Sequence, residues 1–113
     1  MLTISNAQKE VFKQNAKDIF KNNVFRHLRS VFPKETIVIS DEKLADLINC
    51  GIEKSQKYDI TMEWDIRRYL ECCIIYGWNF DTDPNYQWAS SILNDNDIDG
   101  KTKMDKIEQF EDR

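Results

Sequence analysis

Apolar residues recur every three or four positions through the first third of the chain, the period at which an α-helix returns to the same face. The positions are Val11, Phe12, Ala16, Ile19, Phe20, Val24, Phe25, Leu28, Val31 and Phe32. Ser5 and Gln8 have the spacing of a capping box at the start of this stretch, and Pro33 cannot continue a helix. The pattern therefore predicts one long helix between Ser5 and Pro33.

Two more helices are predicted in the middle of the chain. Ser40 followed by Asp41 and Glu42 is a favourable helix start, since a serine cap and early acids both suit the positive N-terminal end. Leucine and isoleucine then recur at helical spacing through residues 44–52. Thr61 predicts the cap of the next helix, which we expect to stop at Gly77.

The remaining segments complete an all-α prediction. Asp83 and Pro84 open a fourth helix, and apolar residues at spacings of three predict a short last helix over residues 104–110. The β-branched stretch 36–39 has no partner strand, so it predicts an extended linker. We expect residues 1–113 to form a single domain, a bundle of four to five helices with a long N-terminal helix. The expected core residues are Phe12, Ile19, Phe20, Leu28, Leu47, Ile52, Leu70 and Ile74.

Composition changes this picture little, but it sets the expected environment. The three cysteines have no spacing that suits a disulfide framework, which favours a reducing compartment and ordinary buried thiols. No apolar run is long enough for a signal peptide or a membrane span. We therefore expect a cytoplasmic protein that makes no membrane contact and is a monomer when free.

Charge is distributed unevenly along the chain. The net charge is −4, but residues 1–34 carry seven basic residues against two acidic ones, so the acids concentrate in the rest of the chain. Lys9, Lys13, Lys17 and Lys21 form one stripe of the first helix. A solvated or internally paired face, an acidic partner and a nucleic acid are the three interpretations; the sequence pI near 5.0 disfavours nucleic acid.

An acidic segment near the C-terminal end has the start of a calcium-binding loop. Asp95, Asp97, Asp99 and Gly100 stand at the first, third, fifth and sixth positions of an EF-hand pattern. The twelfth position, where a bidentate glutamate belongs, is Lys106. The sequence thus predicts no cofactor beyond weak Ca²⁺ binding, with a solvated acidic turn as the alternative.

The stretch from Gly77 to Leu93 is rich in aromatic residues for a segment that is otherwise turn-forming and acidic. Loops usually carry small polar residues, so rings held there either fold onto the core or face a partner. The predicted partner-binding residues are Trp78, Phe80, Asp81, Asp83, Tyr86 and Trp88. The alternative is that these rings close one end of the bundle.

The sequence shows no catalytic signature. His27, the only histidine, has no marked carboxylate or nucleophile to work with, and its place near the end of the first helix suits a structural role. The charges of the third helix fit intrahelical pairs such as Glu63 with Arg67. We therefore expect a protein that is not an enzyme.

Several short motifs are spread over most of the chain: Leu2-Thr3-Ile4-Ser5-x-x-Gln8, Gly51-Ile52-Glu53, Tyr58-Asp59-Ile60, Glu63-x-Asp65, Arg68-Tyr69-Leu70, Gly77-x-x-Phe80-Asp81-x-Asp83-Pro84 and Trp88-Ala89. Together they resemble a family of small helical proteins encoded beside type VI secretion spike and polymorphic-toxin effector genes in Gram-negative bacteria. The resemblance implies an accessory protein that binds a cognate effector, toxin or spike protein as an adaptor or chaperone, or as an immunity protein. The alternatives are a Ca²⁺-binding helical module that uses the 95–100 loop and an unrelated helical interaction domain.

Overall fold

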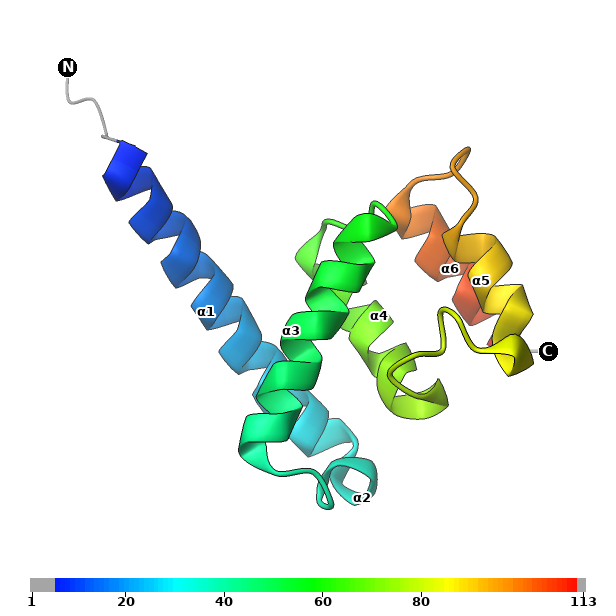
Figure 1. Cartoon of the computed structure of the whole chain (residues 1–113), viewed down its shortest axis with the longest axis horizontal. Coiled ribbons are helices and arrows are strands. Elements are labelled where there is room, and N and C mark those ends of the chain that lie inside the picture. Colours follow the sequence, from blue (N-terminus) through cyan, green and yellow to red (C-terminus); the bar gives the residue numbers. More distant parts are fainter. Residues whose placement is uncertain (1–5, 112–113) are drawn as a thin grey trace.

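The chain folds into helices joined by short turns in the computed structural model, which describes the backbone of residues 6–111 and the side chains of residues 15–110 (Figure 1). There is no strand within that range, so the predicted all-α fold is confirmed. The elements are α1 (Asn6–Val31), α2 (Pro33–Thr36), α3 (Asp41–Lys57), α4 (Glu63–Tyr76), the 3-10 helix η1 (Pro84–Tyr86), α5 (Gln87–Leu93) and α6 (Gly100–Glu111).

Local signals in the sequence place most helix ends correctly. Ser40 caps α3 by accepting a hydrogen bond from the Lys43 amide at 3.1 Å. The helix α1 ends before Pro33, as predicted. The cap of α4 is Met62 rather than Thr61, and it makes no side-chain capping bond. The predicted capping box at the start of α1 depends on Ser5, which lies outside the described residues.

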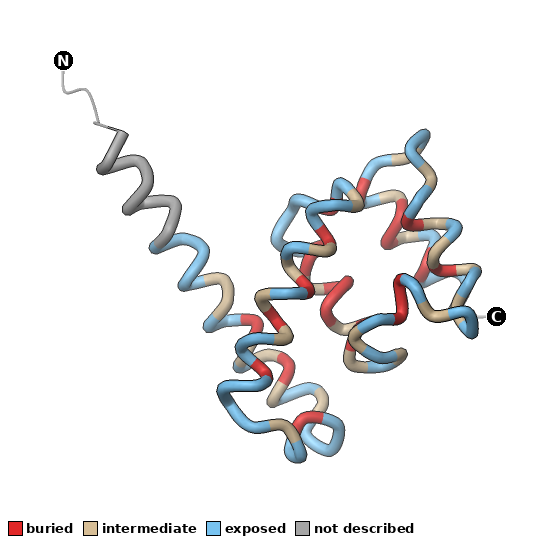
Figure 2. Tube along the Cα trace, viewed as in Figure 1, coloured by how far each residue is buried: buried red, intermediate tan, exposed pale blue. Residues whose placement is uncertain are grey.

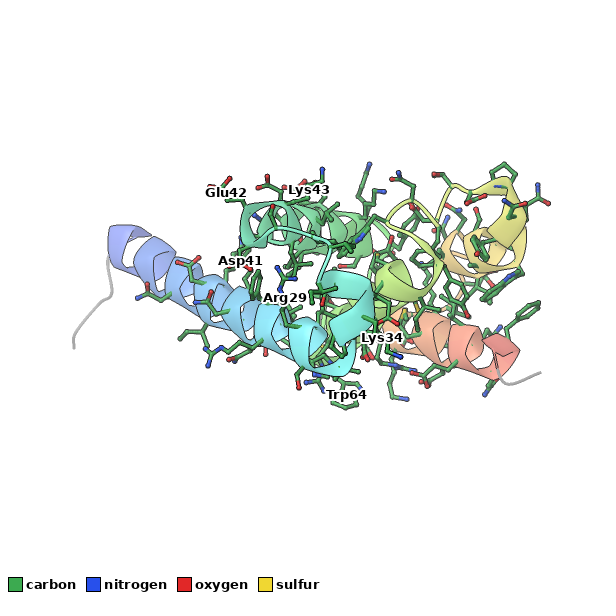
Figure 3. All side chains as sticks on the ribbon, turned by 90° about the horizontal axis from the view of Figure 1, so that it is seen from below. Arg29, Lys34, Asp41, Glu42, Lys43 and Trp64 are labelled. Carbon is green, nitrogen blue, oxygen red and sulfur yellow. The ribbon has the colours of Figure 1, made fainter. Side chains whose placement is uncertain are left out.

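The predicted extended linker at 36–39 is wrong. Thr36 ends the short helix α2, and its buried hydroxyl donates to the Phe32 carbonyl at 2.7 Å. Figure 3 shows Arg29 pointing from α1 towards Asp41 at the start of α3, with which it pairs at 2.7 Å. The same guanidinium donates to the carbonyls of Thr36 and Ile39. The turn is therefore held by hydrogen bonds from the Arg29 side chain.

The core is one cluster of buried side chains drawn from five helices and two loops. The helix α3 packs against both α1 and α4, and α6 packs against α4 and α5 (Figure 1). Figure 2 shows where the buried positions lie along the chain. The buried apolar residues are Val24, Leu28, Leu44, Ile48, Ile60, Ile66, Tyr69, Leu70, Cys72, Cys73, Phe80, Ala89, Leu93, Met104 and Ile107.

The predicted core is correct in part. Leu28 and Leu70 are fully buried, and Phe20, Leu47, Ile52 and Ile74 are partly buried. Ile19 is 62% exposed, so its assignment to the core is wrong. The reason is that residues 15–19 of α1 are all exposed and α1 meets the body only further along the helix. The Phe12 side chain lies outside the described residues.

The cysteines are free thiols. Cys72 and Cys73 are buried, and burial raises the pKa of the Cys73 thiol well above its usual range. Cys50 is exposed, which corrects the expectation that all three are buried. None of the helices in the described part of the chain is both long and apolar enough to cross a bilayer.

Gly100, the first residue of α6, allows a close contact between two parts of the backbone. The chain turns at Asp59, which has a φ of 64°, and the turn brings residues 59–60 against the start of α6. A Cβ atom on Gly100 would stand 2.5 Å from the Asp59 carbonyl oxygen and 2.7 Å from the Ile60 Cα. Both neighbours are backbone atoms, so they cannot move aside as a side-chain end would.

We therefore expect Gly100→Ala to lower the free energy of unfolding by about 1–3 kcal/mol, the usual cost of overpacking. Urea unfolding followed by circular dichroism measures it. Lys106→Ala, at an exposed position of the same helix, is the matched control and should change stability little. An alanine at position 100 that leaves stability unchanged would show that the 59–60 turn is not packed against α6.

Candidate functional site

The segment between α4 and α5 is a folded turn rather than an open loop. Gly77 ends α4 with a φ of 111°, a conformation that favours glycine. The Phe80 amide then donates to the Gly77 carbonyl at 3.1 Å. Asp83 caps η1 by accepting from the Asn85 amide at 2.9 Å, as its place before Pro84 predicted. The predicted site residues are therefore held in fixed positions.

Two of the predicted partner-binding residues are buried. Phe80 is 1% exposed and its ring lies 5.3 Å from that of Tyr69. Asp81 is 4% exposed; it accepts a hydrogen bond from the Tyr58 hydroxyl at 2.8 Å and pairs with Lys54 at 3.4 Å. Burial, together with this hydrogen bond and the negative charge of Asp81, raises the pKa of Tyr58 to about 12. These residues join the turn to the core, so they cannot contact a partner in this structure.

Lys54 links α3 to the turn, and no local pattern in the sequence pointed to this role. Its ammonium donates to the Trp78 carbonyl at 3.1 Å and to the Asn79 side chain at 2.8 Å, besides pairing with Asp81. The Trp78 side chain lies on the same side, against α3, close to Gly51. Trp78 is partly buried there.

The remaining rings form a surface that we call the aromatic face, made of Tyr76, Tyr86, Trp88 and Phe110. The Tyr76 ring lies 5.0 Å from that of Tyr86 and 5.7 Å edge-on from that of Trp88. Trp88 stacks on Phe110 with ring centres 4.2 Å apart and planes 8° apart. Phe110 is 41% exposed, and the other three rings are partly exposed. The structure thus brings Tyr86 and Trp88 together and adds two rings that the sequence did not assign to the site.

A second group of exposed apolar side chains lies at the start of α4. Met62 is 67% exposed and Trp64 is 65% exposed, and Trp64 projects from the lower edge of the molecule in Figure 3. The Arg67 guanidinium lies over the Trp64 ring, 4.3 Å from its centre. The predicted pair of Arg67 with Glu63 is not formed in the described part of the chain. We call Met62, Trp64 and Arg67 the α4 patch.

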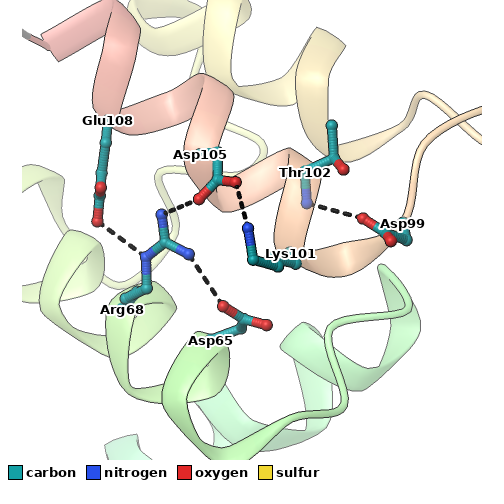
Figure 4. A network of polar contacts seen from close by, with 7 residues as sticks. All are labelled: Asp65, Arg68, Asp99, Lys101, Thr102, Asp105 and Glu108. Carbon is teal, nitrogen blue, oxygen red and sulfur yellow. Dashed lines mark hydrogen bonds and ion pairs between the residues drawn. The ribbon is translucent and has the colours of Figure 1, made fainter.

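Asp65 and Arg68 of α4 are buried, and Arg68 reaches across to α6. Arg68, 9% exposed, donates to Asp65 at 2.9 Å, to Asp105 at 2.8 Å and to Glu108 at 2.8 Å (Figure 4). Burial alone would lower the pKa of Arg68, but hydrogen bonds to its three carboxylate partners outweigh burial and raise it. His27 lies 3.6 Å from Glu71, a contact that also joins two helices. These side-chain contacts therefore link α4 to α6 and to α1.

The acidic loop uses two of its carboxylates to hold its own backbone. Asp95 accepts from the Asp97 amide at 3.0 Å, and Asp99 caps α6 by accepting from the Thr102 amide at 2.8 Å. The hydrogen bonds from Thr102 lower the pKa of the Asp99 carboxyl. No group of three or more histidine, cysteine, aspartate or glutamate side chains in the described part of the chain could hold a metal ion. The three predicted calcium ligands are therefore not gathered into a site in this structure.

The exposed aromatic and apolar side chains are suited to non-covalent binding of another molecule. Rings held by their neighbours at a surface lose little conformational freedom when a partner covers them. Comparison of the chain with protein-family models, with curated proteins and with solved structures found no match.

Proposed function

We propose that the protein is a non-enzymatic accessory of a bacterial type VI secretion or polymorphic-toxin module. In this proposal it binds a cognate effector, toxin or spike protein and acts as an adaptor or chaperone, or as an immunity protein. The motifs quoted from the sequence motivate the choice of module. The observation that carries the binding role is the aromatic face, where stacked rings from α5 and α6 remain partly open to solvent.

Two physical arguments support a protein as the ligand. Tyrosine and tryptophan are enriched at the centres of interfaces, where they bury a large area at a low entropic cost. The chain also has a net charge of −4, and its acids concentrate after residue 34. Charge of this sign favours encounter with a basic partner, which is the character of many toxin domains that act on nucleic acids.

The test is the loss of binding without loss of folding. Tyr86→Ala removes a partly exposed ring from the aromatic face, so we expect the melting temperature to stay close to that of the wild type. Truncation of an interface anchor commonly costs about 2 kcal/mol or more, or about a 30-fold loss of affinity. Co-purification with the effector encoded beside this gene, followed by calorimetry on the purified pair, measures that loss. Lys106→Ala on the exposed side of α6 is the control.

Further variants test which surface binds the partner, separately from whether the proposed module is correct. Trp78→Ala tests the partly buried ring on the α3 side of the turn, and Trp64→Ala tests the α4 patch. If only Trp64→Ala abolishes binding, the α4 patch is the interface and the assignment of the aromatic face is wrong. If the wild type binds none of the proteins encoded beside its gene, the proposed module itself is wrong.

The two forms of the proposal predict different properties of the complex. An immunity protein inhibits the toxin in a purified assay, whereas an adaptor leaves the effector active and links it to a spike protein. A pull-down that contains effector and spike protein together supports the adaptor. Inhibition at equal molar amounts supports the immunity protein.

A further inference from the structure

A polar pocket lies where the end of α3, the turn after α4, the end of α5 and the start of α6 meet. Its volume is about 420 Å³. The polar side chains that matter for its chemistry are Lys54, Lys57, Lys103, Asp81, Asn94 and Asn96. The predicted calcium loop supplies one side of this pocket through Asn96.

One residue of the pocket lining is a buried cation. Lys103 is 1% exposed, and its ammonium donates to the Tyr58 carbonyl at 2.7 Å. An ammonium group has three hydrogens to donate, and none of the carboxylates in the described part of the chain forms an ion pair with this one. The negative end of α3 compensates part of its charge. A buried charge without a full partner is costly, so an anion beside it would be stabilising.

The balance of charge in the lining favours an anion. Three lysines face one carboxylate, and that carboxylate is already engaged by the Tyr58 hydroxyl and by Lys54. Lys57 is exposed at the edge of the pocket, where it can meet an incoming ligand. The side-chain amide of Asn96 adds a neutral donor, whereas that of Asn94 already donates to the carbonyl and the hydroxyl oxygen of Ser90. The local charge is therefore positive in a chain whose net charge is −4.

From this geometry we propose that the pocket binds a small oxyanion, a phosphate or carboxylate group, between Lys103 and Lys57. The loop that the sequence predicted to bind a cation, Ca²⁺, thus lies next to a site proposed for an anion. The carboxylates of Asp95 and Asp97 are not part of the lining. Charge-assisted hydrogen bonds from the ammonium groups would hold the anion, and the Asn96 amide would orient it.

The experiment is a titration of the full chain with inorganic phosphate and, separately, with acetate, against sodium chloride of equal ionic strength. Isothermal calorimetry and the chemical shifts of residues 94–103 report binding, and the melting temperature should rise with the bound anion. We expect Lys103→Met to weaken binding by about tenfold or more, since it removes a charge-assisted donor and keeps the side-chain length. Lys106→Met, on the exposed side of α6, is the matched control.

A second variant covers the case in which Lys103→Met does not fold. Lys57→Gln lies at the exposed edge and should weaken binding by about threefold without affecting stability. Binding of phosphate but not acetate assigns the site to phosphate groups, and the reverse assigns it to carboxylates. The proposal would be overturned if neither anion produced heat on titration. It would also be overturned if Lys57→Gln, and Lys103→Met where it folds, bound the anion as tightly as the wild type. None of these outcomes depends on the effector.

Discussion

Replacing Arg68 with alanine is expected to lower the free energy of unfolding by about 3–5 kcal/mol, the usual cost of breaking a buried ion pair. The guanidinium joins α4 to α6, and its loss leaves the buried carboxylate of Asp65 without its partner. Asp105 and Glu108 are more exposed, so water can replace the arginine there. Most of the loss therefore arises at Asp65.

Urea unfolding of the purified variants at neutral pH measures this effect. Arg67→Ala is the matched control, since it is the same residue type one position along α4. Arg67 lies over an exposed ring, so its loss should cost about 1 kcal/mol or less. Equal effects of the two substitutions would show that the network between α4 and α6 contributes no more than a surface contact.

The same network makes the difference between wild type and Arg68→Ala depend on pH. Hydrogen bonds from Lys101 and Arg68 lower the pKa of the Asp105 carboxyl below its usual 3.8. A lowered carboxyl pKa contributes stability that is present above the unfolded-state value and is lost as the pH falls through the folded-state value. The stability difference between the two proteins should therefore shrink below about pH 4 and be fully present at neutral pH.

Phe80→Ala is expected to lower the free energy of unfolding by about 3–5 kcal/mol, because it leaves a cavity in the core. The ring is 1% exposed and touches the rings of Tyr69 and Tyr76. Tyr76 in turn supports Tyr86 and Trp88, so the cavity lies directly beneath the aromatic face. Thermal unfolding and partner binding should therefore be affected together in this variant.

Comparison with Tyr86→Ala distinguishes a residue that holds the aromatic face in place from one that contacts the partner. Tyr86→Ala should affect binding alone, whereas Phe80→Leu, which refills much of the cavity, should recover most of both properties. A Phe80→Ala protein that melts like the wild type but no longer binds would place Phe80 in the interface after all.

The elements of this fold were predictable where the signal is local. The cap at Ser40, the stop before Pro33 and the start at Asp83 depend on hydrogen bonds within a few residues, so the sequence contains all the partners. The three- and four-residue spacing of apolar positions likewise identified the helices. It could not show which part of each stripe is covered, and Ile19 is exposed because α1 extends past the body at that point.

The candidate site was predicted less well for the same physical reason. The sequence identified an aromatic and acidic segment, but Phe80 and Asp81 are buried by Tyr69, Tyr58 and Lys54, which come from two other helices. Phe110 joins Trp88 from a distant part of the chain, so no local pattern connects the two rings. Trp64 is 65% exposed on α4. The spacing of apolar residues alone does not distinguish such an exposed tryptophan from a core residue.

The position of α6 at the end of the chain order has a consequence for folding during synthesis. This helix supplies Asp105 and Glu108 to Arg68, the Lys103 ammonium to the end of α3, and the buried side chains of Met104 and Ile107. It is the last of the described helices to leave the ribosome. Until then the Arg68 side chain and the part of the core that α6 covers are exposed to solvent or to a chaperone at the tunnel exit. We therefore expect the nascent chain to fold cooperatively only after α6 has emerged and can cover this surface.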